Sequence, residues 1–132
     1  MKYMLDTDIC IYIIKKSPSS VENEFRRHAV DDICISAIAY GELETGVMKS
    51  DNLFANRRAL EEMLSGIKIV PFNALAAEVY GSIRAELEKS GKVIGSNDML
   101  IAAHAKSLGL TLVTNNTKEF DRIPGLCVEN WT

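Results

Sequence analysis

Three acidic side chains occupy positions where carboxylates could bind a metal ion. Asp6 ends the apolar run at residues 3–5, Glu42 borders the apolar stripe of an expected helix, and Asp98 stands at the start of another. No obvious basic partner stands in the same motifs, and carboxylates that gather without one raise each other's pKa. A divalent cation would remove that repulsion. Because oxygen ligands without His or Cys favour Mg²⁺ or Mn²⁺ over zinc, these acids indicate a site of the kind that supports phosphodiester chemistry.

Each acid also has a plain structural explanation. Asp6 and Asp98 could serve only as favourable charges at helix N-termini, and Glu42 could lean outward to water. Other side chains are available to cap the same two helices, which leaves the acids free for chemistry. The caps that we expect are Thr7 or Asp8 for the first helix and Ser96 or Asn97 for the later one.

The elements that must position these acids alternate between short β-like runs and longer helical segments. Strands are expected at residues 3–5, 33–35, 67–70, 111–113 and 126–129. Helices are expected at residues 9–15, 19–28, 37–49, 52–64, 74–89 and 97–108, with a short one in the NNTKEF segment. This alternation predicts an α/β fold with a mostly parallel central sheet of four or five strands and helices on both faces.

Ligand sites of such sheets lie beyond the carboxyl ends of the strands, where the helices begin. That rule selects Asp6 and Asp8 after the first strand and residues 36–42 after the second. It also selects residues 115–119 after the fourth strand, while Asp98 comes just before that strand. We therefore expect the three acids to meet at one edge of the sheet.

The length of 132 residues predicts a single domain spanning residues 1–132, and 47% hydrophobic residues suffice for a core. The N-terminus does not resemble a signal peptide, and the longest apolar run, residues 9–14, is too short to cross a membrane. We therefore expect a cytoplasmic protein without membrane contact.

The net charge of −3 argues mildly against binding of bulk nucleic acid. Acids of a metal site would account for part of that charge, because a bound cation neutralises them. Basic residues also occur in pairs that could either contact phosphates or form solvated helix faces. These pairs are Lys15-Lys16, Arg26-Arg27 and Arg57-Arg58.

The cysteines and histidines form no site of their own. Cys10, Cys34 and Cys127 are too widely spaced for a zinc motif, and an odd number does not suit a disulfide framework. We expect three buried thiols. His28 and His104 are expected within helices, in structural roles.

Three segments together resemble the PIN-domain family, and most closely its VapC-type toxins of bacterial toxin–antitoxin systems. They are MLDTDICIYII, ISAIAYGELETGVMKS and GSNDMLIAAHAKSLGLTLVTNNTKEF, which run in order from Met4 to Phe120. A single DTD motif would be a weak signal. Three segments with compatible spacing over nearly the whole chain are a specific one.

The resemblance implies a PIN-like three-layer sandwich and an Mg²⁺-dependent endoribonuclease, with Mn²⁺ as a substitute. Asp6, Glu42 and Asp98 match the family's acids and would hold the metal directly or through water. Many PIN domains carry a fourth acid where this chain has Asn116, and Glu119 follows one turn later. Asn116 and Glu119 are therefore further catalytic candidates, although both could be plain turn residues.

The resemblance also implies structured RNA as substrate, commonly tRNA, a cognate antitoxin that lays a peptide arm over the active site, and a homodimer. Apolar residues around residues 53–64 could pack inward, or could meet the antitoxin or a second copy. They are Leu53, Phe54, Leu60, Met63 and Leu64.

Two other functions share part of this sequence pattern. A phospho-receiver domain needs an Asp at the end of its middle strand, and residues 67–72 contain none. A PIN-like module that only binds RNA or a partner would normally lack one of the three principal acids, and all three are present.

Overall fold

Five short strands form one parallel sheet in this computed structural model, which describes residues 1–132. The strands are β1 (Tyr3–Leu5), β2 (Ile33–Ser36), β3 (Lys68–Val70), β4 (Thr111–Val113) and β5 (Cys127–Glu129). Their order across the sheet is β3-β2-β1-β4-β5, and all four neighbouring pairs are parallel. The expected α/β fold with a parallel central sheet is confirmed.

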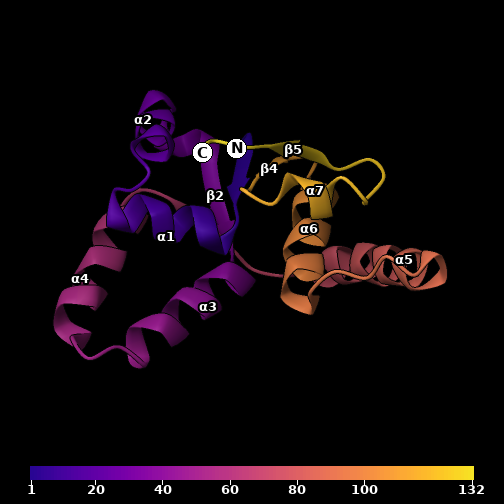
Figure 1. The fold of residues 1–132 in the computed structure, drawn as a ribbon, viewed down its shortest axis with the longest axis horizontal. Helices are drawn as coiled ribbons and strands as arrows, with labels where there is room; N and C mark the ends of the chain where they lie inside the picture. The colour runs from indigo at the N-terminus through magenta and orange to yellow at the C-terminus, as the bar shows by residue number, and fades with distance from the viewer.

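Helices connect every pair of consecutive strands. They are α1 (Thr7–Lys15), α2 (Ser19–Arg27), α3 (Ala37–Met48), α4 (Leu53–Leu64), α5 (Ala74–Ser90), α6 (Ser96–Leu108) and the short α7 (Thr117–Phe120). None of them is both long and apolar enough to span a membrane. In Figure 1, α3 and α4 form a hairpin at one end of the molecule, and α5 packs against α6 at the other.

The chain crosses the sheet in one direction through α1 to α4 and returns in the other through α5 and α6. Because parallel crossovers are right-handed, this reversal places the two groups of helices on opposite faces of the sheet. The central strands are consequently buried on both sides. All four residues of β2 are buried, and Met4 and Leu5 of β1 are completely inaccessible to solvent.

Two of the expected helix starts are wrong. Asp6 itself is the N-cap of α1, where Thr7 or Asp8 was expected, because the helix begins one or two residues nearer the strand. Gly95 is the N-cap of α6 and offers no side chain, so neither Ser96 nor Asn97 caps that helix. Asp6 therefore sits closer to the start of its helix than expected, whereas Asp98 sits slightly further into its helix.

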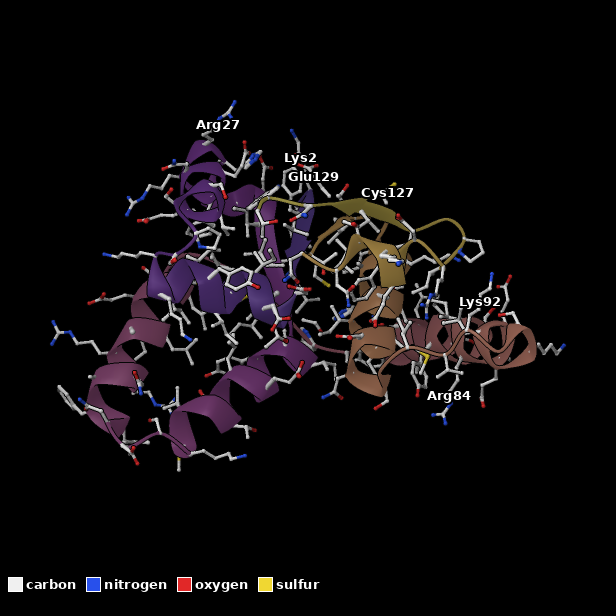
Figure 2. The ribbon with its side chains drawn as sticks, in the orientation of Figure 1. Lys2, Arg27, Arg84, Lys92, Cys127 and Glu129 are labelled. Carbon is white, nitrogen blue, oxygen red and sulfur yellow. The ribbon has the colours of Figure 1, made fainter.

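One of the three cysteines departs from expectation. Cys10 and Cys34 are buried free thiols, as expected, but Cys127 is exposed. It begins β5, the edge strand of the sheet, whose residues are only partly covered. Figure 2 shows its side chain on the outer surface of that strand.

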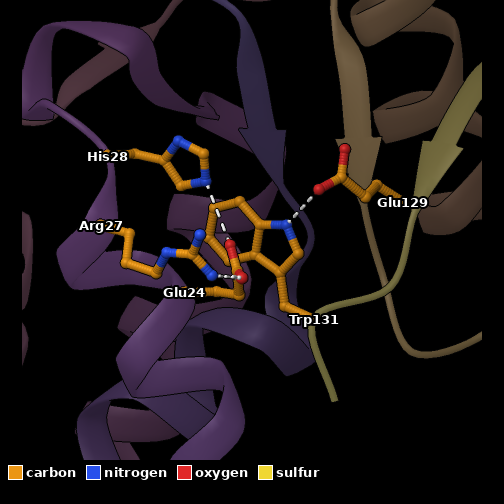
Figure 3. Close-up of polar contacts among 5 residues, drawn as sticks. All are labelled: Glu24, Arg27, His28, Glu129 and Trp131. Atoms are coloured by element: carbon orange, nitrogen blue, oxygen red, sulfur yellow. Dashed lines mark hydrogen bonds and ion pairs between the residues drawn. The ribbon is translucent and has the colours of Figure 1, made fainter.

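The last residues of the chain fold back onto β1 and α2. The ring of Trp131 is 3% exposed and stacks on His28 with ring centroids 5.1 Å apart, while Tyr3 meets both rings. The Trp131 indole N–H donates to Glu129 (2.9 Å), and Glu24 contacts His28 (3.3 Å), as Figure 3 shows. His28 is the C-cap of α2 and lies just outside the helix, not within it as expected. Its ring contacts give it the expected structural role.

Candidate active site

The carboxylate of Asp6 lies directly after β1, at the carboxyl edge of the sheet. It is 5% exposed, and its Oδ1 accepts a hydrogen bond from the backbone N–H of Ile9 (2.9 Å). The Asp6 backbone N–H donates to the carbonyl of Val113, at the end of β4 (3.0 Å). Asp6 is therefore held in place where two central strands end.

Burial controls the ionisation of Asp6. The pKa of this carboxyl is raised from 3.8 to about 6, chiefly by burial and to a smaller extent by the negative charges of Asp8 and Asp98. Hydrogen bonds from Thr114 and Ile9 favour the charged form but do not outweigh burial. A nearby cation stabilises the ionised form of a buried carboxylate, because its charge compensates for the solvation that burial removes.

We expect Asp6→Asn to stabilise the metal-free protein at neutral pH. Asparagine keeps an acceptor for the Ile9 N–H and removes a charge that the folded state disfavours. Because the folded pKa is raised, the stability that wild-type Asp6 contributes is complete below its unfolded value of 3.8 and is lost as pH rises through about 6. The variant should gain about 2–3 kcal/mol in unfolding free energy at about pH 8.

Urea unfolding of both proteins in EDTA, at a series of pH values, measures this difference. The gain should shrink towards zero below about pH 4, where both side chains are neutral. A gain that is independent of pH would contradict the assignment of the effect to the Asp6 charge.

Glu42 reaches the same edge from the second turn of α3, the helix that begins at the end of β2. Its Oε1 accepts a hydrogen bond from the Thr7 hydroxyl at 2.7 Å. Thr7 is the first residue of α1 and follows Asp6 directly. This bond turns the half-buried Glu42 carboxylate towards the Asp6 segment and away from bulk water.

Asp98 lies in the first turn of α6, as the sequence predicts. Burial raises the pKa of its carboxyl, and the negative charges of Glu119, Glu42 and Asp8 raise it further, in that order. Those three acids belong to α7, α3 and α1. Asp98 therefore lies within electrostatic range of four other carboxylates, those of Asp6, Asp8, Glu42 and Glu119.

Asn116 and Glu119 flank the start of α7. The Asn116 backbone N–H donates to the Thr114 hydroxyl (3.0 Å), and its side chain makes no capping hydrogen bond. The Asn116 carbonyl accepts from the Glu119 N–H (3.2 Å). Asn116 is thus a turn residue by its backbone, with a half-buried side chain that remains free, and Glu119 is near enough to Asp98 to influence its charge.

No basic side chain pairs with these acids. Each of the six ion pairs lies elsewhere, and four of them engage the arginines of the expected basic pairs. These pairs are Arg26–Glu22, Arg27–Glu24, Arg57–Glu44 and Arg58–Glu62. The arginines therefore fit the solvated-face alternative better than a role in gripping phosphate, whereas Lys15 and Lys16 remain without an acidic partner.

The donor set has the chemistry that Mg²⁺ prefers, since it consists of oxygens alone. As the side chains stand, no three His, Cys, Asp or Glu residues are close enough to form a cage of direct ligands. Mg²⁺ does not require one, because proteins commonly hold it through one or two carboxylates and several waters. Asp6 and Asp98 fit such a site, and Glu42, already bonded to Thr7, could contribute through water.

Two side chains of this site have no place among the sequence-based candidates. Thr7 holds Glu42, and Thr114 contacts both Asp6 and the Asn116 turn. Both hydroxyls follow a strand at the carboxyl edge of the sheet, so the strand-end rule could have selected them. The sequence pattern predicts Thr7 only as a helix cap and assigns no role to Thr114.

Comparison with known proteins gives consistent matches over the whole chain. The sequence model of the PIN domain matches residues 3–126. The chain is 48% identical to Ribonuclease VapC2 of Rickettsia felis, covering 99% of this chain and 98% of that protein. It is 43% identical to the tRNA(fMet)-specific endonuclease VapC of Shigella flexneri, covering 100% and 99%.

Solved structures show the same fold. VapBC2 from Rickettsia felis, bound to a DNA fragment from its promoter, matches with a TM-score of 0.92 and 46% identity over 100% of both chains. DNA-bound VapBC from Salmonella typhimurium matches with a TM-score of 0.94 and 40% identity, over 100% of this chain and 99% of that one.

Proposed function

The chain belongs to the PIN-domain family, among its VapC-type toxins, and on that premise we propose that it is a metal-dependent endoribonuclease. The observation that carries the proposal is the group of carboxylates at the carboxyl edge of the sheet. Asp6 is buried with a raised pKa, Asp98 faces three further negative charges, and no basic side chain neutralises them. Such a group suits a divalent cation and a phosphodiester substrate.

The reaction is the hydrolysis of a phosphodiester bond, in which water adds across the P–O bond that breaks. A divalent cation at this site, Mg²⁺ or Mn²⁺, would supply an activated nucleophile and offset charge on the phosphate. Asp6 and Asp98 would hold the cation, with Glu42 contributing directly or through water. Glu119 would accept a proton from the attacking water, and the free amide of Asn116 would orient that water molecule.

Structured RNA, and tRNA in particular, is the proposed substrate class. Two relatives of 43% and 40% identity over nearly their whole length are named as tRNA(fMet)-specific endonucleases. The initiator tRNA is therefore the first substrate to test. An enzyme with this substrate would act in the cytoplasm.

Removal of the metal tests this function. Purified protein should cleave RNA in Mg²⁺ or Mn²⁺, lose that activity in excess EDTA and regain it when Mg²⁺ is restored, because the carboxylates alone cannot offset the charge of the phosphate. Gel analysis of a tRNA substrate measures the rate. Cleavage that continues undiminished in EDTA would exclude the metal-dependent mechanism.

A PIN-like module that binds RNA without cutting it is the second candidate. Retention of Asp6, Glu42 and Asp98, together with the Thr7 hydroxyl that holds Glu42, favours the enzyme. Binding of the same tRNA without cleavage in Mg²⁺ would favour the module.

A cognate antitoxin is the proposed protein partner. A cavity of about 330 Å³ between α1, α3 and α4 has walls of Ile11, Ile14, Leu43, Val47 and Leu60, with Glu42 also lining it. An apolar peptide arm in this cavity would therefore also reach a carboxylate of the proposed site. The two matching structures are of DNA-bound VapBC.

The fold buries some of the residues expected to meet a partner and leaves others exposed. Leu60 and Met63 are buried, whereas Leu53 and Phe54 are 47% and 77% exposed at the start of α4. We propose that this exposed end contributes to a homodimer or to the antitoxin contact. Light scattering should give twice the 14.6 kDa chain mass for the toxin alone, and a larger mass with antitoxin. A mass of one chain, both alone and in the presence of antitoxin, would contradict both proposed contacts.

A further inference from the structure

A buried hydrogen bond joins the two helices that carry Glu42 and Asp98. Nδ1 of His104, in α6, lies 2.8 Å from Oγ of Ser36, the N-cap of α3. Both side chains are buried, with exposed fractions of 1% and 0%. Ser36 precedes Glu42 by six residues, and His104 follows Asp98 by six, so the bond lies inside the molecule behind the proposed site.

The surroundings of the pair set the direction of this bond. The His104 ring donates to the backbone carbonyl of Pro71, which has no N–H to offer, and burial lowers the pKa of the ring. A neutral ring that donates through Nε2 to Pro71 must accept at Nδ1, so the Ser36 hydroxyl donates there. Ser36 Oγ in turn accepts from the Ile38 N–H (3.1 Å). Every polar atom of the pair is satisfied.

No other side-chain hydrogen bond connects the α3 segment with α6. Their other contacts involve no side-chain hydrogen bond, and packing alone restrains sliding and rotation less than a hydrogen bond, which restrains both distance and angle. The Phe72 ring meets the His104 ring edge-on at 5.3 Å and closes the remaining side. The His104 ring thus links α6 to the start of α3 and to the segment after β3.

We propose that His104 is a positioning residue, which through Ser36 fixes α3 against α6 and so sets the spacing of Glu42 and Asp98. The inference rests on the proposed function, since it concerns the same carboxylates. A shift of about 1 Å in a catalytic group can cost about 100-fold in rate. Loss of the Ser36 bond should therefore lower kcat more than it changes KM.

Two substitutions separate the ring's two hydrogen bonds. His104→Asn places an amide oxygen where Nδ1 stands and keeps the acceptor for Ser36, but loses the bond to Pro71. His104→Gln places an amide N–H where Nε2 stands and keeps the bond to Pro71, but loses the bond to Ser36. Both variants remove the ring from the same buried place, so each serves as the control for the other.

We expect His104→Gln to lower kcat by about 10- to 100-fold and His104→Asn by about threefold or less. A second readout needs no RNA: the rise in Tm on addition of Mn²⁺ should be smaller for His104→Gln than for wild type and near wild type for His104→Asn. Equal losses of kcat with equal Mn²⁺ shifts in the two variants would overturn the proposal, because the ring would then act by packing alone.

Ser36→Ala provides an independent route should His104→Gln fold poorly. It should lower kcat in wild type about as much as in His104→Asn, since both retain the acceptor for its hydroxyl. A Ser36→Ala protein with wild-type kcat would overturn the proposal. A wild-type chain that neither cleaves RNA nor gains Tm with Mn²⁺ would instead overturn the proposed function itself.

Discussion

Asp98→Asn should lower the rate of RNA cleavage by at least about 100-fold, the scale expected for loss of a main electrostatic catalyst. Asparagine preserves the size of the side chain but removes the charge that would offset the cation. The fold should not suffer, because burial and three neighbouring acids already disfavour that charge in the free protein. Initial rates on a tRNA substrate in saturating Mg²⁺ measure the effect.

Two control variants show whether the loss is specific. Asp51→Asn neutralises an exposed acid between α3 and α4 and should leave the rate unchanged. Glu119→Gln should reduce the rate by about 10-fold, since an outer group tunes the site without holding the cation. An Asp98→Asn protein as active as Asp51→Asn would remove Asp98 from the mechanism.

Expression of the wild-type chain without antitoxin should arrest bacterial growth, and Asp6→Asn should abolish that arrest. The physical reason is that Asp6 is fixed at the ends of β1 and β4, so an uncharged side chain there would remove a carboxylate that the proposed mechanism assigns to the cation. Colony counts after induction measure the effect, with immunoblots to show equal protein levels.

Co-expression of the cognate antitoxin should restore colony formation to the wild-type strain. Equal growth of strains that express wild type and Asp6→Asn would contradict toxicity through nuclease action. Asp6→Asn is expected to stabilise the metal-free fold, so the immunoblots should show no loss of the variant through degradation.

The strand-end rule accounts for most of what the sequence could predict. Short apolar runs separated by longer helical segments indicated the parallel sheet, and at the carboxyl edge of that sheet Asp98 lies within electrostatic range of Asp6 and Glu42. The helical periodicity of apolar residues, and the glycines that follow it, also predicted the ends of α5 and α6. Gly91 and Gly109 adopt the left-handed conformation there. These features depend on local pattern and on topology that is common to parallel α/β folds.

Features that depend on side-chain partners far along the chain were not predictable in the same way. The hydrogen bond from Thr7 to Glu42 spans 35 residues, and that between Ser36 and His104 spans 68. Nothing in the local sequence of His104 distinguishes a ring that links two helices from one that merely fills space. The exposure of Cys127 likewise follows from the position of β5 at the edge of the sheet, which is a property of strand order.

The N-caps of α1 and α6 were predicted wrongly for a different reason. Several neighbouring side chains could cap α1. The N-cap is Asp6, the residue that the sequence predicts as a metal-binding acid. The two roles are compatible, because the cap engages Oδ1 alone, and Oδ2 has no backbone N–H donor. At α6 the cap is a glycine, so the first turn offers no capping side chain that competes with Asp98.

The most direct test of a carboxylate-based, metal-dependent endoribonuclease is to map the ends of RNA cut by the purified protein. Total RNA is incubated with wild type or Asp98→Asn in Mg²⁺, and new ends are located by sequencing. The account predicts internal cuts at a few discrete positions, most of them in tRNA, for wild type only. New ends that are absent with wild type, or that occur equally with Asp98→Asn, would contradict it.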